Sequence, residues 1–459
     1  MTITLVTQRI DDQTVTENAT EATFDLSQNF DDPLTTGQIA RFEFANSSLG
    51  GGITDVLLFD QTGAGAPESV KNFRNYVNDE DYTGSIIHRS IPGFIIQGGG
   101  FRVDPSTDFN ANLEEIESIP DDPAVVNEFS AARSNRRGTI ALAKLGNDPN
   151  SATNQWFFNL ADNSENLDNQ NGGFTVFGEV LTESDLAPVD GISNLSAFDA
   201  SGFFSEPQPD FRGAFTDVPL IFDDAGNADF VGLNSVTIFQ EEELEFSVIG
   251  NSNPDLVEAI ITEGELVLDY APNRSGVARI TVKATNLLGD SVEDRFIVAV
   301  GDAEPDLDPQ GSTVYRFLNT DTAVHLYTSS EVERAFIEEN LPNYISEGSA
   351  YVSVDPFTGN PEPEKVYRFL NQDTGTHLYT TSEIERESVE DNLPNFSLET
   401  EFFFAFAEQQ EGTVPVYRFF NTDTGAHFYT PSETERQSVE DTLPNYQSEG
   451  IAYYTYQTS

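Results

Sequence analysis

Two stretches of the chain decide the fold: IIHRSIPGFIIQGGGF at Ile86–Phe101 and NEFSAARSNRRGTIALAKLGNDPNSATNQWFFNL at Asn127–Leu160. Short apolar runs in both are separated by Gly, Asn, Asp and Ser, which is typical of short strands joined by loops. Similar runs lie at 39–44, 56–59 and 174–180. A helix is expected at 66–76, where apolar residues recur at helical spacing. Many short strands with few helices predict a closed β-barrel with capping helices.

These stretches, together with GGFTVFGEVL at Gly172–Leu181, resemble the cyclophilin family of peptidyl-prolyl isomerases. The resemblance covers about residues 40–182. It implies an eight-stranded barrel capped by two helices, and isomerisation of X–Pro bonds without a cofactor. Amide resonance sets a barrier of about 18–20 kcal/mol for this rotation. The reaction therefore needs a donor aimed at the prolyl nitrogen, an apolar seat for the ring and hydrogen bonds to the peptide, rather than a nucleophile.

By this resemblance Arg89 is the catalytic guanidinium, and Gln97 orients it and holds the substrate backbone. The resemblance assigns substrate binding to Phe94 and Phe157 in the proline pocket, Leu142 and Leu167 in its wall, Ala143 and Lys144 in a strand that pairs with substrate, and Gln155 and Phe174 beside it.

Three positions depart from the family pattern. Phe174 stands where a His is frequent, Lys144 stands where an Asn is common, and Asn166 replaces a frequent Trp at the rim. Because Arg89 and Gln97 are intact, we expect activity to survive. Binding of cyclosporin-class inhibitors should be weakened by the missing Trp.

The composition limits the classes of partner. The 459 residues carry 78 acidic and 22 basic side chains, which gives a net charge of −56 and excludes nucleic acid as a natural partner. The absence of Cys excludes disulfides and thiolate chemistry. Such acidity suits a protein that works in salt. No apolar run is long enough to span a membrane, and the N-terminus lacks the pattern of a secretory signal. An extracellular or cell-surface location is favoured, and a cytoplasmic one stays open.

The length predicts roughly three domains, and we expect a mainly β, multidomain chain. Residues 1–37, with strands at 2–6 and 22–26, and residues 243–300 resemble two parts of one cadherin-like or immunoglobulin-like β-sandwich. The isomerase segment at 38–242, including a loop-rich extension from 183, would then be inserted into that sandwich. The alternative is an N-terminal arm beside a separate small β domain. The acidic pairs of this region, Asp11–Asp12 and Asp31–Asp32, fit solvated surface better than a Ca²⁺ site.

A polar linker at 301–312 precedes an internal repeat. VYRF begins at Val314, Val366 and Val416, which are 52 and 50 residues apart, and the predicted units are about 313–364, 365–414 and 415–459. The units resemble a repeat of unknown function from secreted bacterial hydrolases. Three copies suggest a trefoil-like domain, with glycans or cell-surface components as candidate partners.

Each repeat carries one His, at His325, His377 and His427. We expect each to pack beside the Tyr two residues later and to satisfy a local hydrogen bond; a ligand pocket and a metal site are the alternatives. The repeated Arg316, Arg368 and Arg418 are expected to pair with Glu331, Glu383 and Glu433. Ser330, Ser382 and Ser432 are expected to start capping boxes with Glu333, Glu385 and Glu435.

Two functions follow. The first is a prolyl isomerase that acts on exported or surface proteins, with accessory domains for attachment. The second is a surface protein whose barrel binds proline-containing peptides without catalysis and whose repeats bind glycans.

Overall fold

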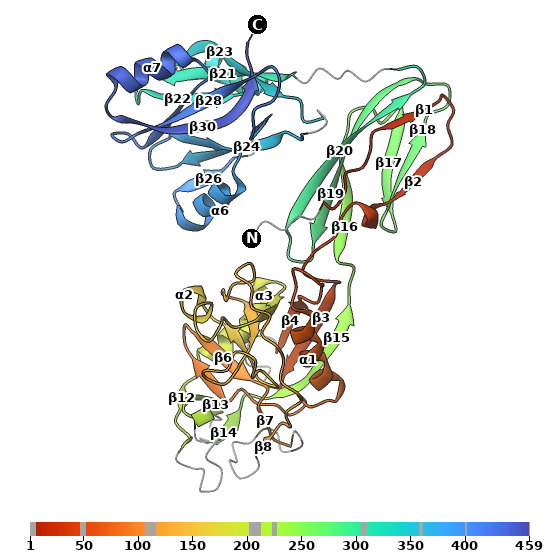
Figure 1. Ribbon diagram of the computed structural model, residues 1–459, viewed down its shortest axis with the longest axis vertical. Coiled ribbons are helices and arrows are strands. Elements are labelled where there is room, and N and C mark those ends of the chain that lie inside the picture. Colours follow the sequence, from red (N-terminus) through yellow and green to blue (C-terminus); the bar gives the residue numbers. More distant parts are fainter. Residues whose placement is uncertain are drawn as a thin grey trace.

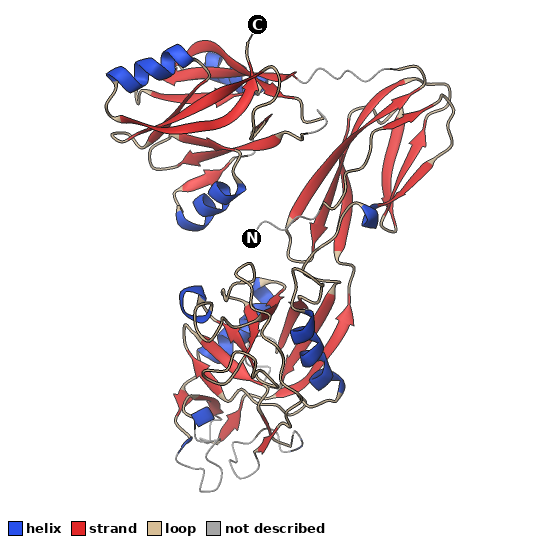
Figure 2. Ribbon diagram, viewed as in Figure 1, coloured by secondary structure: helices blue, strands red, loops and turns tan. Residues whose placement is uncertain are grey.

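The structure is a computed structural model of the chain. It describes residues 6–45, 52–104, 106, 109, 116–201, 213–222, 227–303, 310–357, 361–399 and 402–458. Strands dominate, and the helices are few and short (Figure 2). Residues 2–5 of the expected strand at 2–6 and residues 304–309 of the expected linker at 301–312 lie outside the described residues. Residues 310–312 of that linker belong to a strand instead.

An eight-stranded sheet forms the first part of the fold (Figure 1). Its order is β15 (Leu233–Gln240), β3 (Gln38–Phe44), β4 (Ile53–Leu58), β11 (Val176–Val180), β9 (Thr139–Leu142), β10 (Trp156–Asn159), β6 (Ile95–Gly98) and β5 (Arg89–Ile91). An isolated bridge between Ile86 and Gly232 joins the regions that precede its two edge strands. The sheet therefore curls back toward itself, and we call it the curled sheet.

Alternation along these strands divides the curled sheet into two faces. Phe42, Ile140, Trp156 and Phe158 lie on the inner face and belong to one buried cluster. Apolar residues of α1 (Pro67–Asn78) and α3 (Glu183–Ser193) complete that cluster. These two helices thus cover the inner core, as expected for the two capping helices.

The prediction that 183–242 is loop-rich is wrong. It contains α3, whose N-cap Thr182 accepts a hydrogen bond from the Asp185 N–H, and β15, which pairs with β3 along its whole length. Pro188 and Gly191 disfavour a helix in the sequence. Burial of Leu186, Val189 and Ile192 on one face of α3 outweighs them. The same region holds β12 (Ala197–Phe198), β13 (Val218–Phe222) and β14 (Ala228–Phe230), and Phe203, Phe204 and Phe211 lie outside the described residues.

Smaller elements complete this part of the chain. They are the two-stranded sheet of β7 (Phe101–Arg102) and β8 (Glu117–Ser118), and the short helix α2 (Ser164–Leu167).

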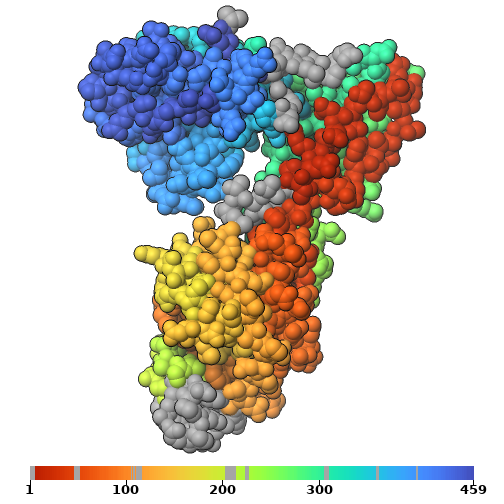
Figure 3. Space-filling view, in the orientation of Figure 1, coloured from red at the N-terminus to blue at the C-terminus, as the bar shows by residue number. Residues whose placement is uncertain are grey.

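Two further sheets bring the N-terminal segment beside residues 244–300. One has the order β1 (Gln13–Val15), β20 (Ser291–Val300), β19 (Gly276–Asn286) and β16 (Leu244–Asn251), and the other has the order β17 (Val257–Thr262), β18 (Glu265–Tyr270) and β2 (Ala22–Asp25). Ile10, Leu26 and Phe30 share one buried cluster with residues from Leu244 to Val300. The space-filling view shows the N-terminal segment, in red, lying against the green later strands (Figure 3). We call this part the flanking sheets.

One member of the acidic pairs in this region, Asp32, is buried rather than solvated. Asp32 is fully buried, which raises the pKa of its carboxyl. It accepts hydrogen bonds from the Leu34 N–H and from Asn286 Nδ2, both at 3.0 Å. The prediction of a solvated side chain is therefore wrong for Asp32, which ties the segment before β3 to the β19–β20 hairpin.

Each repeat has two strands and a helix, followed by one long strand in the first and third repeats and by two short strands in the second. The first has β21 (Gln310–Asn319), β22 (Val324–Thr328), α5 (Glu331–Asn340) and β23 (Tyr344–Val354); the second has β24 (Glu364–Asn371), β25 (His377–Thr380), α6 (Glu383–Asn392), β26 (Phe396–Leu398) and β27 (Phe403–Ala405); the third has β28 (Thr413–Asn421), β29 (Ala426–Thr430), α7 (Glu433–Thr442) and β30 (Tyr446–Tyr456). We call the three together the repeat unit.

Three buried tyrosines form a closed ring at the centre of the repeat unit. Tyr379 Oη donates to the Tyr327 carbonyl at 2.9 Å, Tyr327 Oη to the Tyr429 carbonyl at 2.6 Å, and Tyr429 Oη to the Tyr379 carbonyl at 2.9 Å. Each hydroxyl also accepts a backbone N–H from the tyrosine whose carbonyl it binds. The rings meet edge to face with centroids 5.4–5.7 Å apart. One tyrosine from each repeat thus links it to the other two.

The expected ion pairs of the repeats are wrong in their partners. Arg316 pairs with Glu435, Arg368 with Glu333, and Arg418 with Glu385, so each pair joins two repeats. Glu331, Glu383 and Glu433 pair instead with Arg334, Arg386 and Arg436 one helical turn away.

The expected capping boxes form only in part. Ser330, Ser382 and Ser432 accept the expected backbone N–H. Their own N–H groups donate to Thr328, Thr380 and Thr430 Oγ1 at 3.0 Å. The glutamates are therefore free to reach the neighbouring repeat.

The three histidines have local partners, as expected. The Nε2 atoms of His325, His377 and His427 lie 3.2–3.4 Å from Glu347, Glu399 and Glu449. Each ring lies 6.3–6.4 Å from the Tyr two residues later.

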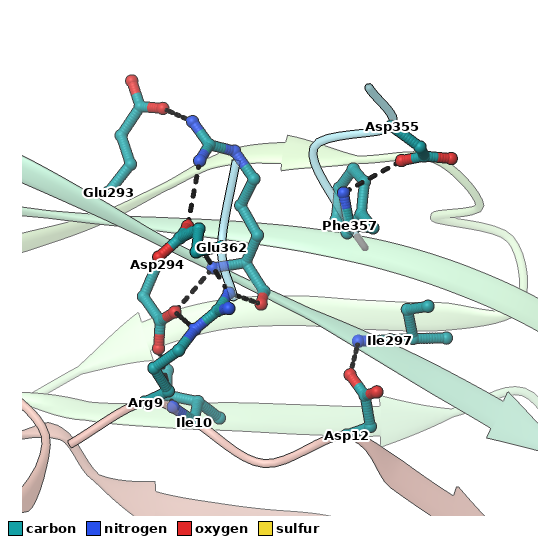
Figure 4. Close-up of polar contacts among 10 residues, drawn as sticks. Arg9, Ile10, Asp12, Glu293, Asp294, Ile297, Asp355, Phe357 and Glu362 are labelled. Carbon is teal, nitrogen blue, oxygen red and sulfur yellow. Dashed lines mark hydrogen bonds and ion pairs between the residues drawn. The ribbon is translucent and has the colours of Figure 1, made fainter. Parts of the chain in front are cut away.

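Ion pairs join the flanking sheets to the segment that connects the first two repeats (Figure 4). Glu362 lies 3.6 Å from Arg9 Nη2 and 3.5 Å from Arg295 Nη1, while Arg279 Nη1 donates to Asp355 at 2.7 Å. Arg9 Nε donates to the buried Asp294 at 3.0 Å, which fixes the guanidinium in place. Burial raises the pKa of Glu362 despite the two guanidinium groups.

Candidate active site on the outer face of the curled sheet

The outer face of the curled sheet carries most of the predicted site. Arg89 of β5 lies opposite Gln97 of β6, and Gln97 lies opposite Phe157 of β10 on its other side. Gln155 precedes β10, and its carbonyl accepts the Ala143 N–H at 2.8 Å. Because directly opposed residues share a face of a sheet, their side chains gather in one region.

A chain of side-chain hydrogen bonds links the polar members. Arg89 Nη1 donates to Gln97 Oε1 at 3.4 Å, and Gln97 Nε2 donates to Gln155 Oε1 at 2.8 Å. All three side chains are half-buried. Within the described part of the chain no carboxylate pairs with Arg89, and its guanidinium donates to the neutral amide of Gln97 instead.

Apolar side chains lie beside this polar chain. Phe157 and Leu167 are buried, Phe94 and Phe174 are half-buried, and all four belong to one cluster. The Phe157 and Phe174 rings meet edge to face with centroids 5.7 Å apart. The Phe94 carbonyl accepts from the Leu160 N–H at 2.9 Å and from Asn163 Nδ2 at 2.8 Å, which fixes the backbone at Phe94.

Two predicted residues have a different environment from the expected one. Leu142 is wrong as a wall residue, because strand alternation places it in the inner cluster with Trp156. The side chain of Lys144 is bound to its own protein: Nζ donates to the carbonyls of Asn171 and Gly173 at 3.0 and 2.5 Å. Burial lowers the pKa of this ammonium. Asn166, which stands at the rim position, is exposed.

Two known families match parts of the chain. Residues 49–206 match the family described as cyclophilin type peptidyl-prolyl cis-trans isomerase/CLD, and residues 305–456 match a domain of unknown function (DUF5648). The chain is 42% identical over 131 residues to a peptidyl-prolyl cis-trans isomerase of Acinetobacter baylyi, covering 28% of this chain and 62% of the relative. It is 35% identical over 155 residues to the peptidyl-prolyl cis-trans isomerase cyp18 of Streptomyces antibioticus, covering 33% of this chain and 85% of the relative. This chain belongs to the cyclophilin family.

A crystal structure of a Cryptosporidium parvum cyclophilin type peptidyl-prolyl cis-trans isomerase in the presence of the dipeptide ala-pro also aligns with this cyclophilin. The identity is 19% and the TM-score is 0.28, over 44% of this chain and 99% of the other. The chain spans only 62% of the length of the Acinetobacter relative.

Residue-by-residue reading missed two members of the site in this cyclophilin. Ile95 is buried in the outer cluster with Phe157. Its spacing of two residues from Gln97 on β6 is the signal that could have found it. Asn163, which holds the Phe94 carbonyl, also donates to Asn159 Oδ1 at 2.8 Å. Its partners are distant in sequence, so no local pattern marks it.

Over the residues that the structure describes, no group of three or more His, Asp or Glu side chains is arranged to hold a metal ion. Among the same residues, no helix is both long and apolar enough to cross a membrane.

Proposed function

We propose that the whole chain catalyses cis–trans isomerisation of X–Pro bonds on the outer face of the curled sheet. The observation that carries this proposal is the Arg89–Gln97–Gln155 hydrogen-bond chain beside the Phe94–Phe157–Leu167 cluster. It places an oriented cation next to a cluster of apolar side chains. The family membership supports the same reaction, because the relatives carry the name of this activity.

The chemistry follows from these residues. A guanidinium that donates to the prolyl nitrogen withdraws its lone pair from amide resonance and lowers the rotational barrier. Arg suits this role because it stays charged and its donors are rigidly placed. Gln97 holds the guanidinium from one side, and the apolar cluster binds the ring. The substrate class is proline-containing peptides or proteins.

Exchange spectroscopy by NMR on an Ala–Pro–Phe peptide tests the proposal with the full chain. We expect substoichiometric protein to accelerate cis–trans exchange. Arg74→Ala on α1 is the matched control for Arg89→Ala, since it removes an arginine without touching the site. Peptide binding without acceleration would instead establish the second candidate, a non-catalytic peptide-binding surface protein. The departures at Phe174 and at Asn166, which stands in place of the rim Trp, support that candidate.

We also propose that residues 1–37 and 243–300 are one split sandwich of the cadherin or immunoglobulin type, with the isomerase segment at 38–242 inserted. The pairing of β1 with β20 and of β2 with β18 supports this division. The tyrosine ring supports treating 313–459 as one trefoil-like domain. Limited proteolysis tests both: cleavage near 37 or 242 should leave the two flanking fragments associated, and their separation would refute the split sandwich.

We propose that the protein works outside the cytoplasm, with the repeat unit serving attachment. The net charge of −56 supports a salt-rich environment in which self-repulsion is screened. Fractionation of the source cells with a specific antibody tests this location. Recovery in the cytosolic fraction alone would overturn it.

A further inference from the structure

A tight turn beside the site is bound by side chains at three successive carbonyls. Asn171, Gly172 and Gly173 have φ values of 49°, 76° and 75°, all in the left-handed region. Lys144 Nζ donates to the carbonyls of Asn171 and Gly173, and Asn127 Nδ2 donates to that of Gly172 at 2.7 Å. A turn of this conformation is entropically costly, and the ammonium stabilises it by satisfying two carbonyls that point the same way.

The turn is also tied back to the strand end that bears the lysine. Asn171 Nδ2 donates to the Leu145 carbonyl at 2.9 Å. A Cβ atom at Gly173 would lie 2.3 Å from the Phe129 ring, so the turn packs closely on its other side as well. The turn, Lys144 and the 127–129 segment therefore form one rigid assembly, which we call the lysine clamp.

Phe174 follows the lysine clamp directly and connects it to the apolar cluster. Lys144 Nζ lies 4.8 Å from the centroid of the Phe174 ring, in cation–π contact, and that ring meets Phe157 edge to face. Among the described residues no carboxylate pairs with Lys144. Desolvating a half-buried cation that is held only by carbonyls and a ring costs free energy. The hydrogen bonds and ring contact of Lys144 offset that cost and hold these groups in place.

We propose that Lys144 is a positioning residue that holds Phe174 against Phe157, and that Phe174 thereby selects peptides with a large apolar side chain next to the proline. This rests on the proposed isomerase function and adds a preference to it. Phe174 is half-buried, and its ring meets that of Phe157 edge to face with centroids 5.7 Å apart. Lys144 itself acts through the turn, since its donors are engaged by the protein.

The test compares exchange of Ala–Pro–Phe and Ala–Pro–Ala peptides by wild type, Lys144→Met, Lys144→Arg and Phe174→Ala. We expect Lys144→Met to raise KM for Ala–Pro–Phe about tenfold, because misplacing a binding group by a fraction of an ångström weakens substrate positioning. Its kcat should change less than about twofold, because Arg89 and Gln97 are untouched. The preference for Ala–Pro–Phe should disappear, and Lys144→Arg should restore it in part. Lys71→Met, on α1, is the matched control and should behave as wild type.

A double variant separates positioning from general stability. In Phe174→Ala, the added Lys144→Met change should have no further effect on KM, because its target is gone. An unchanged KM and unchanged peptide preference in Lys144→Met would overturn the inference while the isomerase function stands. Equal rates on both peptides in wild type would overturn it too, even where Lys144→Met does not fold. If wild type accelerates neither peptide, the proposed function fails first.

Discussion

Arg89 and Gln97 face each other across the β5–β6 pair, and Arg89 Nη1 donates to Gln97 Oε1 at 3.4 Å. Gln97 Nε2 in turn donates to Gln155 Oε1 at 2.8 Å. The guanidinium is thus oriented by an amide that is itself held in place. A neutral partner orients the cation without cancelling its charge, which is what a donor to a prolyl nitrogen requires.

Replacing Gln97 with Ala should lower kcat for peptide exchange by about tenfold, since the guanidinium loses its orienting partner. NMR exchange at several peptide concentrations separates kcat from KM. Gln38→Ala is the matched control, because Gln38 bonds to Asp60 away from the site. A Gln97 variant with wild-type kcat would show that Arg89 needs no support from this amide.

Leu142 and Leu167 should respond in opposite ways to truncation. Leu142→Ala leaves a cavity in the inner core and should cost about 2–5 kcal/mol of unfolding free energy with KM unchanged. Leu167→Ala removes a member of the outer cluster and should raise KM. Calorimetry and peptide exchange on both variants check this. A raised KM in a folded Leu142→Ala protein would show that Leu142 does line the substrate-binding surface.

Tyr379→Phe should destabilise the repeat unit by about 1–3 kcal/mol, because the buried Tyr327 N–H and carbonyl both lose their partner. Tyr315→Phe is the control: its exposed hydroxyl bonds to Glu331 at 2.6 Å, and its loss should cost less than about 0.5 kcal/mol. Differential scanning calorimetry of the full chain measures both. Equal, small changes would mean that the tyrosine ring contributes little to stability.

His88 should make the curled sheet sensitive to acid. It is buried between Phe101 and Phe215, and desolvation lowers its pKa from 6.5 to about 3. Below pH 6.5 the unfolded chain therefore binds a proton that the folded chain does not. Its contribution to stability is full above that pH and falls toward pH 3, by up to about 1.4 kcal/mol per pH unit. Chemical denaturation of His88→Phe between pH 7 and pH 4 should show a shallower loss than wild type; parallel curves would contradict this.

The sequence predicted the parts of the fold that local pattern controls. The family resemblance, carried by residues such as Arg89, Phe94 and Gln97, named side chains that the structure brings together on the outer face. Prediction from the sequence failed where tertiary packing outweighs the local preference of the chain. Helix α3 forms despite Pro188 and Gly191 because its apolar side enters the inner core.

The remaining errors have a common origin in long-range contacts. Leu142 was placed by resemblance rather than by alternation, which sets it on the inner face. Arg316, Arg368 and Arg418 each pair with a glutamate of their own repeat and with a second glutamate of a neighbouring repeat. No pattern within one repeat encodes which glutamate of the neighbouring repeat will be nearest.

The central claim is tested most directly by the exchange rate of an Ala–Pro–Phe peptide with the full chain, wild type against Arg89→Ala, in moderate salt. We predict clear acceleration by wild type and a fall of about a hundredfold or more in Arg89→Ala, because the developing lone pair loses its donor. Phe94→Ala should instead weaken peptide binding. Acceleration that persists in a folded Arg89→Ala protein, or none in wild type, would contradict the account.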